Sequence, residues 1–177
     1  EVRRAAGHRQ EDDPLGLRRK VQRIDQAAAG ERINGRFTGG GLIAGVATAV
    51  KAKFPQAQVI VAEPKDYDDH GLSLRAGHRE AHHAAGRTIC DALMAAMPGE
   101  MTFSINSKLL ANGVTASDEE VGAPVAYAYR ELKLVVEPTG CLAAAALLEG
   151  AIDLRGARVG VIVSGGNVDL PRYASLL

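Results

Sequence analysis

The sequence predicts an α/β fold, with a mainly parallel sheet flanked by helices. Two short apolar runs rich in β-branched residues, at 59–62 and 159–163, alternate with longer helical patterns, as in chains built from β-α-β units. Strands of a parallel sheet are buried on both faces, and such runs suit that position. The 177 residues, 46% hydrophobic and 24% charged, are enough for one globular domain.

The first half of the pattern contains three predicted helices and one strand. In chain order they are a helix at 42–50, a strand at 59–62, a polar helix at 71–85 and a helix at 89–97.

The second half begins with a strand at Val114 and Thr115. Ser117 stands three residues before Glu120, which is the spacing of a capping box, and predicts a helix that runs toward residue 133. Pro124 lies inside this helix and predicts a kink or interruption. An alanine-rich helix at 141–148 and the strand at 159–163 follow.

Composition and charge exclude several classes of partner. Lys and Arg balance Asp and Glu at 21 each, so neither a nucleic acid nor an acidic membrane surface is expected as a partner. No apolar run approaches the roughly 18 residues of a membrane span. Cys90 and Cys141 lie far apart without a Cys-x-x-Cys spacing, which predicts buried free thiols and a cytoplasmic protein.

Residues 1–36 differ from the rest of the chain. Basic side chains are scattered among acids, glycine and alanine, and no apolar run there would serve as a buried strand. We therefore expect a poorly ordered or loosely docked segment of unclear fold at 1–36, followed by one domain at 37–177.

A run of three glycines precedes the first predicted helix. Gly39, Gly40 and Gly41 are followed by Leu42, so backbone N–H groups and the helix N-terminus can surround an anion such as phosphate. The run is neither a P-loop nor a Gly-x-Gly-x-x-Gly motif, and a plain flexible turn is the alternative.

Two further motifs follow predicted apolar runs. Ser164 and Gly165 come directly after the strand at 159–163, where ligands of open α/β sheets bind, although a simple glycine turn would read the same way. Glu137 precedes Pro138 and a helix of small residues, and it is either part of the same site or a solvated helix-start carboxylate.

Four carboxylates crowd into residues 63–69, after the first strand. Such density requires either solvent or a cation, and oxygen ligands favour Mg²⁺ or Ca²⁺. A charged surface loop is the alternative. Three histidines at 78, 82 and 83 lack the cysteine or carboxylate that would complete a metal set, so a metal site there is not expected.

In order along the chain, Gly-Gly-Gly-Leu-Ile-Ala-Gly, Ala-Glu-Pro, Val-Glu-Pro-Thr-Gly and Ser-Gly-Gly-Asn-Val-Asp resemble the C-terminal portion of the serine/threonine dehydratases. This family, which includes serine racemase and hydroxyaspartate dehydratase, consists of fold-type II enzymes that use pyridoxal 5'-phosphate (PLP). The resemblance covers residues 37–177 and implies a three-layer α/β domain, present in part. It further implies elimination of water and ammonia from L-threonine or L-serine.

The resemblance also implies a role for each matching residue. Gly39, Gly40, Gly41 and Leu42 would hold the PLP phosphate, Ser164 with Gly165 would meet the pyridine nitrogen, and Glu137 would stand near the ring. Glu63, Asp69 and the backbone carbonyl of Tyr67 would bind the divalent cation.

Departures from the family pattern indicate an incomplete enzyme. Thr38 stands where the family usually has a fourth glycine, and Gly122 with Pro124 falls in a helix that the family keeps continuous. The family's Ser-Phe-Lys motif, which carries the Schiff-base lysine, and its Ser-Ser-Gly-Asn-His substrate loop are both absent from the sequence. We therefore identify no catalytic residue and expect a truncated chain. We expect it to be inactive alone, either as a dehydratase fragment, as half of a split enzyme complemented by a separate N-terminal half, or as a non-catalytic cofactor- or cation-binding module. A homodimer is the other expected assembly.

Overall fold

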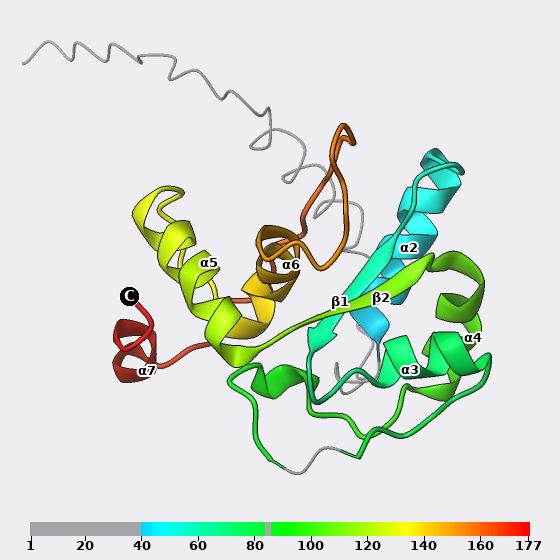
Figure 1. Ribbon diagram of the computed structural model, residues 1–177, viewed down its shortest axis with the longest axis horizontal. Helices are drawn as coiled ribbons and strands as arrows, with labels where there is room; N and C mark the ends of the chain where they lie inside the picture. The colour runs from blue at the N-terminus through cyan, green and yellow to red at the C-terminus, as the bar shows by residue number, and fades with distance from the viewer. Residues whose placement is uncertain (1–39, 84–85) are drawn as a thin grey trace, which may run out of the picture. The chain divides into compact units, whose positions relative to one another are not determined.

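Two parallel strands form the sheet of this α/β chain in the computed structural model, which describes residues 40–83 and 86–177 (Figure 1). Strand β1 (Ile60–Pro64) pairs with β2 (Asn112–Ala116) in register, so that Ile60 lies opposite Asn112 and Pro64 opposite Ala116. Both strands therefore end at the same edge, where β1 leads into the acidic loop and β2 leads into a helix.

Helices follow and precede the strands throughout the described residues. They are α2 (Gly41–Lys53), α3 (Asp69–Ala76), a single 3-10 turn η2 (Asp91–Leu93), α4 (Glu100–Leu109), α5 (Asp118–Arg130), α6 (Pro138–Leu148) and the short α7 (Leu170–Ala174).

The main hydrophobic core lies between the sheet and the pair α5 and α6, which pack along one another (Figure 1). Val121 and Val125 of α5 and Ala145 of α6 have no exposed surface, and Leu142 has almost none. Burying a Val or Leu side chain contributes about 1.5–3 kcal/mol. A second pair, α2 with α4, packs separately and presents the first turn of α2 to α3 and α4.

Several expected elements are confirmed. The strand at 59–62 is β1, Val114 and Thr115 lie in β2, and the helices at 42–50 and 141–148 fall within α2 and α6.

The predicted capping box is also present. The Ser117 hydroxyl accepts from the Glu120 N–H at 3.3 Å, and the Glu120 carboxylate accepts from the Ser117 N–H at 2.6 Å. Pro124 does not interrupt the helix, because α5 continues to Arg130, and the expected kink at Pro124 stays a prediction. Burial of Pro124 within the core offsets the backbone hydrogen bond that a proline cannot donate.

Two helices are shorter than their patterns predict. Instead of 71–85, α3 ends at Ala76, because Gly77 adopts a left-handed conformation with φ 76° and turns the chain. Residues 84 and 85 lie outside the described part. Of 89–97 only η2 is helical, and before it the Asp118 carboxylate accepts a hydrogen bond from the backbone N–H of Ile89 at 2.9 Å.

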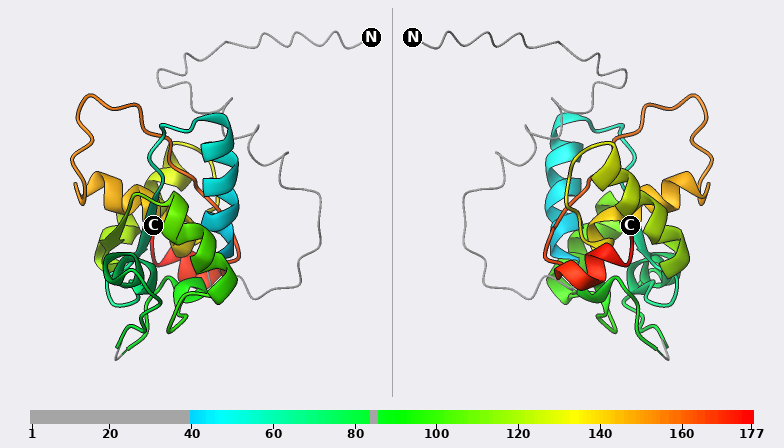
Figure 2. Two further views of the ribbon diagram at one scale, coloured as in Figure 1. Left: turned by 90° about the vertical axis from the view of Figure 1, so that its right-hand side faces the viewer. Right: turned by 90° about the vertical axis from the view of Figure 1, so that its left-hand side faces the viewer.

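The run at 159–163 does not form a strand, contrary to its pattern (Figure 2). It makes no backbone hydrogen bond among the described residues, and Val159 and Ile162 remain 39% and 36% exposed. A strand requires a neighbour to pair with, and neither described strand pairs with this run.

Helix α4 was not predicted. Its apolar signal is weak, since its two buried side chains are Phe103 and the polar Asn106.

No helix among the described residues is long and apolar enough to cross a membrane. The expectations for residues 1–36 and for Thr38 and Gly39 fall outside the described part of the chain.

The capping box of α5 yields a prediction about stability. Replacing Ser117 by Ala leaves a backbone N–H of the first turn without its acceptor, so the free energy of unfolding should fall by about 1 kcal/mol. Urea unfolding measures this change. The control Ser107→Ala, at an exposed position inside α4, should change it by less than about 0.5 kcal/mol, and equal effects of the two variants would contradict the prediction.

Candidate cofactor and cation site

The carboxylate of Glu63, in β1, hydrogen-bonds to backbone groups at the start of α3. Its two oxygens accept hydrogen bonds from the backbone N–H groups of His70 at 2.9 Å and Gly71 at 2.8 Å. These donors belong to the first turn of α3, where no intrahelical acceptor exists, and Asp68 at the N-cap provides no side-chain cap. Glu63 therefore acts as a cap supplied by another element, which explains why a carboxylate is buried there.

His70 joins this carboxylate to a second one. Its Nδ1 lies 3.3 Å from Oε1 of Glu63 and 3.7 Å from Oδ2 of Asp69, and all three residues are at most 4% exposed. Burial alone would lower the pKa of His70, but hydrogen bonds and charge from Asp69 and Glu63 outweigh it and raise that pKa to about 9. Burial raises the pKa of Glu63, although its hydrogen bonds act in the opposite direction.

Glu63, Asp69 and His70 form a group that could hold a cation. Each offers one ligand atom, and these atoms lie within 4.8 Å of one another. The structure thus brings together two of the three predicted ligands and adds His70, which the sequence reasoning missed. The available signal was a histidine directly after two acids at a helix start.

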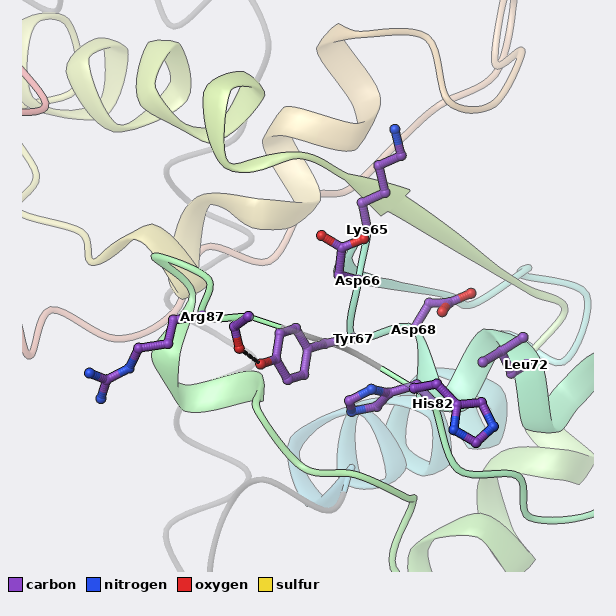
Figure 3. Close-up of a pocket in the computed structure, with 9 residues that line it drawn as sticks. Lys65, Asp66, Tyr67, Asp68, Leu72, His82 and Arg87 are labelled. Atoms are coloured by element: carbon purple, nitrogen blue, oxygen red, sulfur yellow. Dashed lines mark hydrogen bonds between the residues drawn. The ribbon is translucent and has the colours of Figure 1, made fainter.

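The third predicted ligand, Tyr67, is buried beside the group. Its hydroxyl donates to the carbonyl of Gly86 and its ring meets His82 edge-on at 4.6 Å (Figure 3). The role predicted for Tyr67 concerns its backbone carbonyl and stays a prediction.

The start of α2 lies directly against this group. Gly40, the N-cap, has φ 87°, and a Cβ there would fall 2.1 Å from Nε2 of His70 and 3.0 Å from Nδ2 of Asn106. Only glycine fits, because both the conformation and the space exclude a side chain. The glycine loop and the acidic loop, which the sequence presented as separate motifs, are therefore in contact.

The first turn of α2 is available to an anion. Within residues 40–83 and 86–177 no side chain caps it, no acidic residue lies in it, and Gly41 and Leu42 are exposed. The N–H groups of a helix start, together with its dipole, bind phosphate. Nearby, Nε2 of His70 and Oδ1 of Asn106 are buried without a hydrogen-bond partner in the described part of the chain. A phosphate group fits the N–H groups of the helix start and an N–H at Nε2 of His70, whereas Oδ1 of Asn106 is itself an acceptor.

Glu137, Ser164 and Gly165 form a second assembly at the start of α6. The N–H of Glu137 donates to the carbonyl of Gly165 at 3.2 Å, and the Glu137 carboxylate accepts from the N–H of Asn167 at 3.0 Å. Gly165 has φ 72°, and a Cβ there would lie 2.1 Å from Glu137. The structure thus brings these three predicted residues together. That they face the same cofactor as Gly40 stays a prediction.

Gly140 has no side chain, which allows the backbone of Ser164 to lie against the start of α6. A Cβ on Gly140 would lie 1.5 Å from the carbonyl oxygen of Ser164, whose N–H donates to the Gly140 carbonyl at 3.3 Å. Ser164 itself is half-buried, so part of its surface remains open to a ligand.

A hollow lies beside the acidic loop, away from these assemblies. Its volume is about 450 Å³, and none of the residues predicted for PLP lines it (Figure 3). The lining residues are Lys65, Asp66, Tyr67, Asp68, Leu72, His82, His83, Gly86 and Arg87.

Both cysteines are buried thiols, as predicted. Burial raises the pKa of Cys90 to about 12 and that of Cys141 to about 11, so neither is a thiolate near neutral pH. The histidines at 78, 82 and 83 take no part in the candidate cation group.

The Gly140 contact yields a second prediction. Gly140→Ala should lower the free energy of unfolding by about 2–3 kcal/mol, because backbone atoms of Ser164 would have to move. Gly122→Ala, in α5 with open space around it, should raise that free energy by about 0.5–1 kcal/mol. Chemical denaturation of both variants measures the contrast, and a tolerated Gly140→Ala would refute the contact.

The acid–histidine group predicts a dependence on pH. The pKa of His70 is raised in the folded state, so its contribution is complete below about pH 6.5 and is lost as the pH rises through about 9. In chelator, the free energy of unfolding should fall by about 2 kcal/mol between pH 6.5 and 9. His70→Gln should remove this slope. A wild-type profile parallel to that of the variant would show that His70 has no raised pKa.

Residues 33–165 match the family described as pyridoxal-phosphate dependent enzyme. The L-threo-3-hydroxyaspartate ammonia-lyase of a Pseudomonas species is 39% identical over 139 residues, which are 78% of this chain and 43% of that protein. The chain spans less than half the length of the curated relatives it matches.

Solved structures agree. The threonine deaminase of T.th. aligns with a TM-score of 0.66 and 40% identity, over 75% of this chain and 44% of that one. Maize serine racemase aligns with a TM-score of 0.69 and 35% identity, over 78% and 45%. These neighbours are fold-type II enzymes, so the predicted α/β fold class is confirmed. Since the matched residues make up most of its length, the chain belongs to the family of pyridoxal-phosphate dependent enzymes.

Proposed function

We propose that this chain provides the cofactor-binding portion of a PLP-dependent lyase that converts L-threonine or L-serine to a 2-oxo acid and ammonia, and that it is catalytically incomplete alone. The observation that carries the proposal is the start of α2, where Gly40 lies against two buried polar side chains that each keep one atom without a partner among the described residues. PLP, when bound, supplies an electron sink for negative charge at the α-carbon of an amino acid.

The chain's own residues would bind and orient this cofactor. The first-turn N–H groups of Gly41 and Leu42 would hold its phosphate, as helix starts do. Ser164 would hydrogen-bond the pyridine nitrogen through its hydroxyl, and Glu137, fixed by Asn167, would keep the segment at 164–167 in place. A neutral partner for the nitrogen suits elimination, because it leaves the ring a weaker electron sink.

Proton transfer at the α-carbon requires a base that we assign to no residue of this chain. The sequence contains neither the Ser-Phe-Lys motif nor the substrate loop of the resembling family. The choice between threonine, serine and a hydroxyaspartate therefore depends on residues outside the proposed phosphate and ring contacts. Both cysteines are free thiols, which favours a reaction in the cytoplasm.

A divalent cation, Mg²⁺ or Ca²⁺, would bind Glu63 and Asp69 together with the carbonyl of Tyr67. The two buried carboxylates supply the hard oxygen ligands that these ions prefer.

A specific observation favours a second candidate, namely half of a split enzyme or one subunit of an assembly. Two apolar segments keep exposed side chains, Leu134 and Val135 in one and Val159 and Ile162 in the other. Val135 is 57% exposed and Leu134 48%. Apolar surface of this kind is commonly covered by another polypeptide. A complementing chain that bears the catalytic lysine, or a second copy, would cover it, and a non-catalytic cofactor- or cation-binding module is the remaining alternative.

The phosphate assignment predicts the effect of charge at the start of α2. Gly41→Asp, which has open space around its Cβ, should weaken binding of PLP and of inorganic phosphate about tenfold or more through repulsion. Gly45→Asp places the same charge one turn further along the same helix, also in open space, and should change affinity less than about threefold. Phosphate affinity is measured from amide chemical shifts, and equal affinities of the two variants would contradict the assignment.

The wild-type chain serves to test the proposed catalytic incompleteness. After PLP addition and desalting, borohydride reduction with mass analysis shows whether PLP is linked to a lysine, and release of ammonia from serine and threonine shows turnover. We expect no turnover above that of free PLP. Release above this background, with PLP trapped on one lysine, would establish a complete enzyme instead.

A further inference from the structure

Two buried polar side chains from different helices contact Gly40, the N-cap of α2. His70 comes from α3 and Asn106 from α4, and the Nδ2 atom of Asn106 donates to the carbonyl of Gly40 at 3.4 Å. The His70 side chain is 4% exposed and Asn106 is fully buried. Apolar residues would fill such positions at a lower desolvation cost, so polarity here requires an explanation.

Each of these side chains retains an atom without a partner. Nε2 of His70 and Oδ1 of Asn106 are buried and make no hydrogen bond to any described residue. An unsatisfied buried polar atom costs about 1–3 kcal/mol. Both atoms belong to side chains that contact Gly40, at the helix start where we place a phosphate group. A bound phosphate would remove this cost for Nε2 of His70, whereas Oδ1 of Asn106 is an acceptor, so Asn106 would contact phosphate through the N–H groups of Nδ2.

The His70 ring is fixed with Nε2 toward the glycine. Its Nδ1 lies against Glu63 and Asp69, so rotation of the ring would separate it from both carboxylates. The Cβ position of Gly40, which is the point where a side chain would begin, is 2.1 Å from Nε2. The imidazole therefore borders the helix start and is held there before any ligand arrives.

We propose that His70 and Asn106 are side-chain contacts of the phosphate group at the start of α2, His70 through Nε2 and Asn106 through its amide. The inference rests on the proposed function, since it adds two side chains to a site otherwise built from backbone N–H groups. The ligand class is a phosphate monoester, of which PLP is one example, and inorganic phosphate is its minimal probe.

The two side chains would give the site more than charge attraction. Backbone N–H groups donate to any small anion, whereas a fixed imidazole and an amide define directions from which a tetrahedral phosphate is held. Because α3 and α4 supply these contacts and α2 supplies the backbone N–H groups, a bound phosphate would contact three helices.

The first measurement observes His70 in the wild-type chain. With ¹⁵N in the histidine rings, addition of inorganic phosphate should shift the Nε2 signal of His70 with the same midpoint as the amide signals of Gly41 and Leu42. The exposed His78 and His83 are internal controls and should not shift. His70→Gln assigns the signal, and PLP replaces phosphate in a repeat titration.

The second measurement separates binding from stability. Asn106→Leu replaces a buried, incompletely bonded amide by an apolar side chain of similar size, so the free energy of unfolding should be unchanged or higher. Phosphate affinity should nevertheless fall about fivefold or more through the lost contact. Asn112→Leu, at an exposed position, is the matched control and should bind phosphate as the wild type does.

The outcomes distinguish this inference from the function on which it rests. If phosphate shifts the Gly41 and Leu42 signals, while His70 Nε2 stays unmoved and Asn106→Leu binds normally, the two side chains only pack and the inference is overturned. If neither phosphate nor PLP moves any of these signals, the proposed function fails and the inference fails with it. Coincident shifts together with weakened binding by a stable Asn106→Leu support both.

Discussion

The capping of α3 by Glu63 is the contact on which the candidate site depends. Glu63 belongs to β1, so its position follows from the pairing of β1 with β2, and its two hydrogen bonds fix where α3 begins. That start places His70 against Gly40, and hence α3 against the first turn of α2. One carboxylate therefore transmits the geometry of the sheet to a helix that supplies the site, and its burial is explained by the two N–H groups that it satisfies.

The residues predicted for the candidate site form two assemblies with similar contacts. In each, a carboxylate accepts backbone N–H groups, and a glycine in a left-handed conformation lies against a polar side chain. Glu63 and Gly40 form one such pair through His70, and Glu137 with Gly165 forms the other directly. Glycine is required at both positions for a reason of space as well as of conformation.

Much of this arrangement could be predicted from the sequence, because its signals are local. Each of three signals lies within a few residues of sequence. They are the capping box at Ser117, the β-branched run of β1 and the glycine run before α2. The helix predicted over 71–85 fails because Gly77 ends α3, and the strand predicted at 159–163 fails because pairing depends on a neighbour that no local pattern reveals. His70 was missed for the same reason, since its role arises from a contact with Gly40, thirty residues earlier in the chain.

The exposed run at 159–163 has a practical consequence for the behaviour of the chain in solution. An extended apolar segment whose backbone N–H and C=O groups have no partner among the described residues is a template for pairing with other chains. At high concentration the chain is therefore prone to self-association through residues 159–163, because no charged side chain lies between Val159 and Val163 to oppose it. A polypeptide that covered the segment would act as a solubilising partner as well as a structural one.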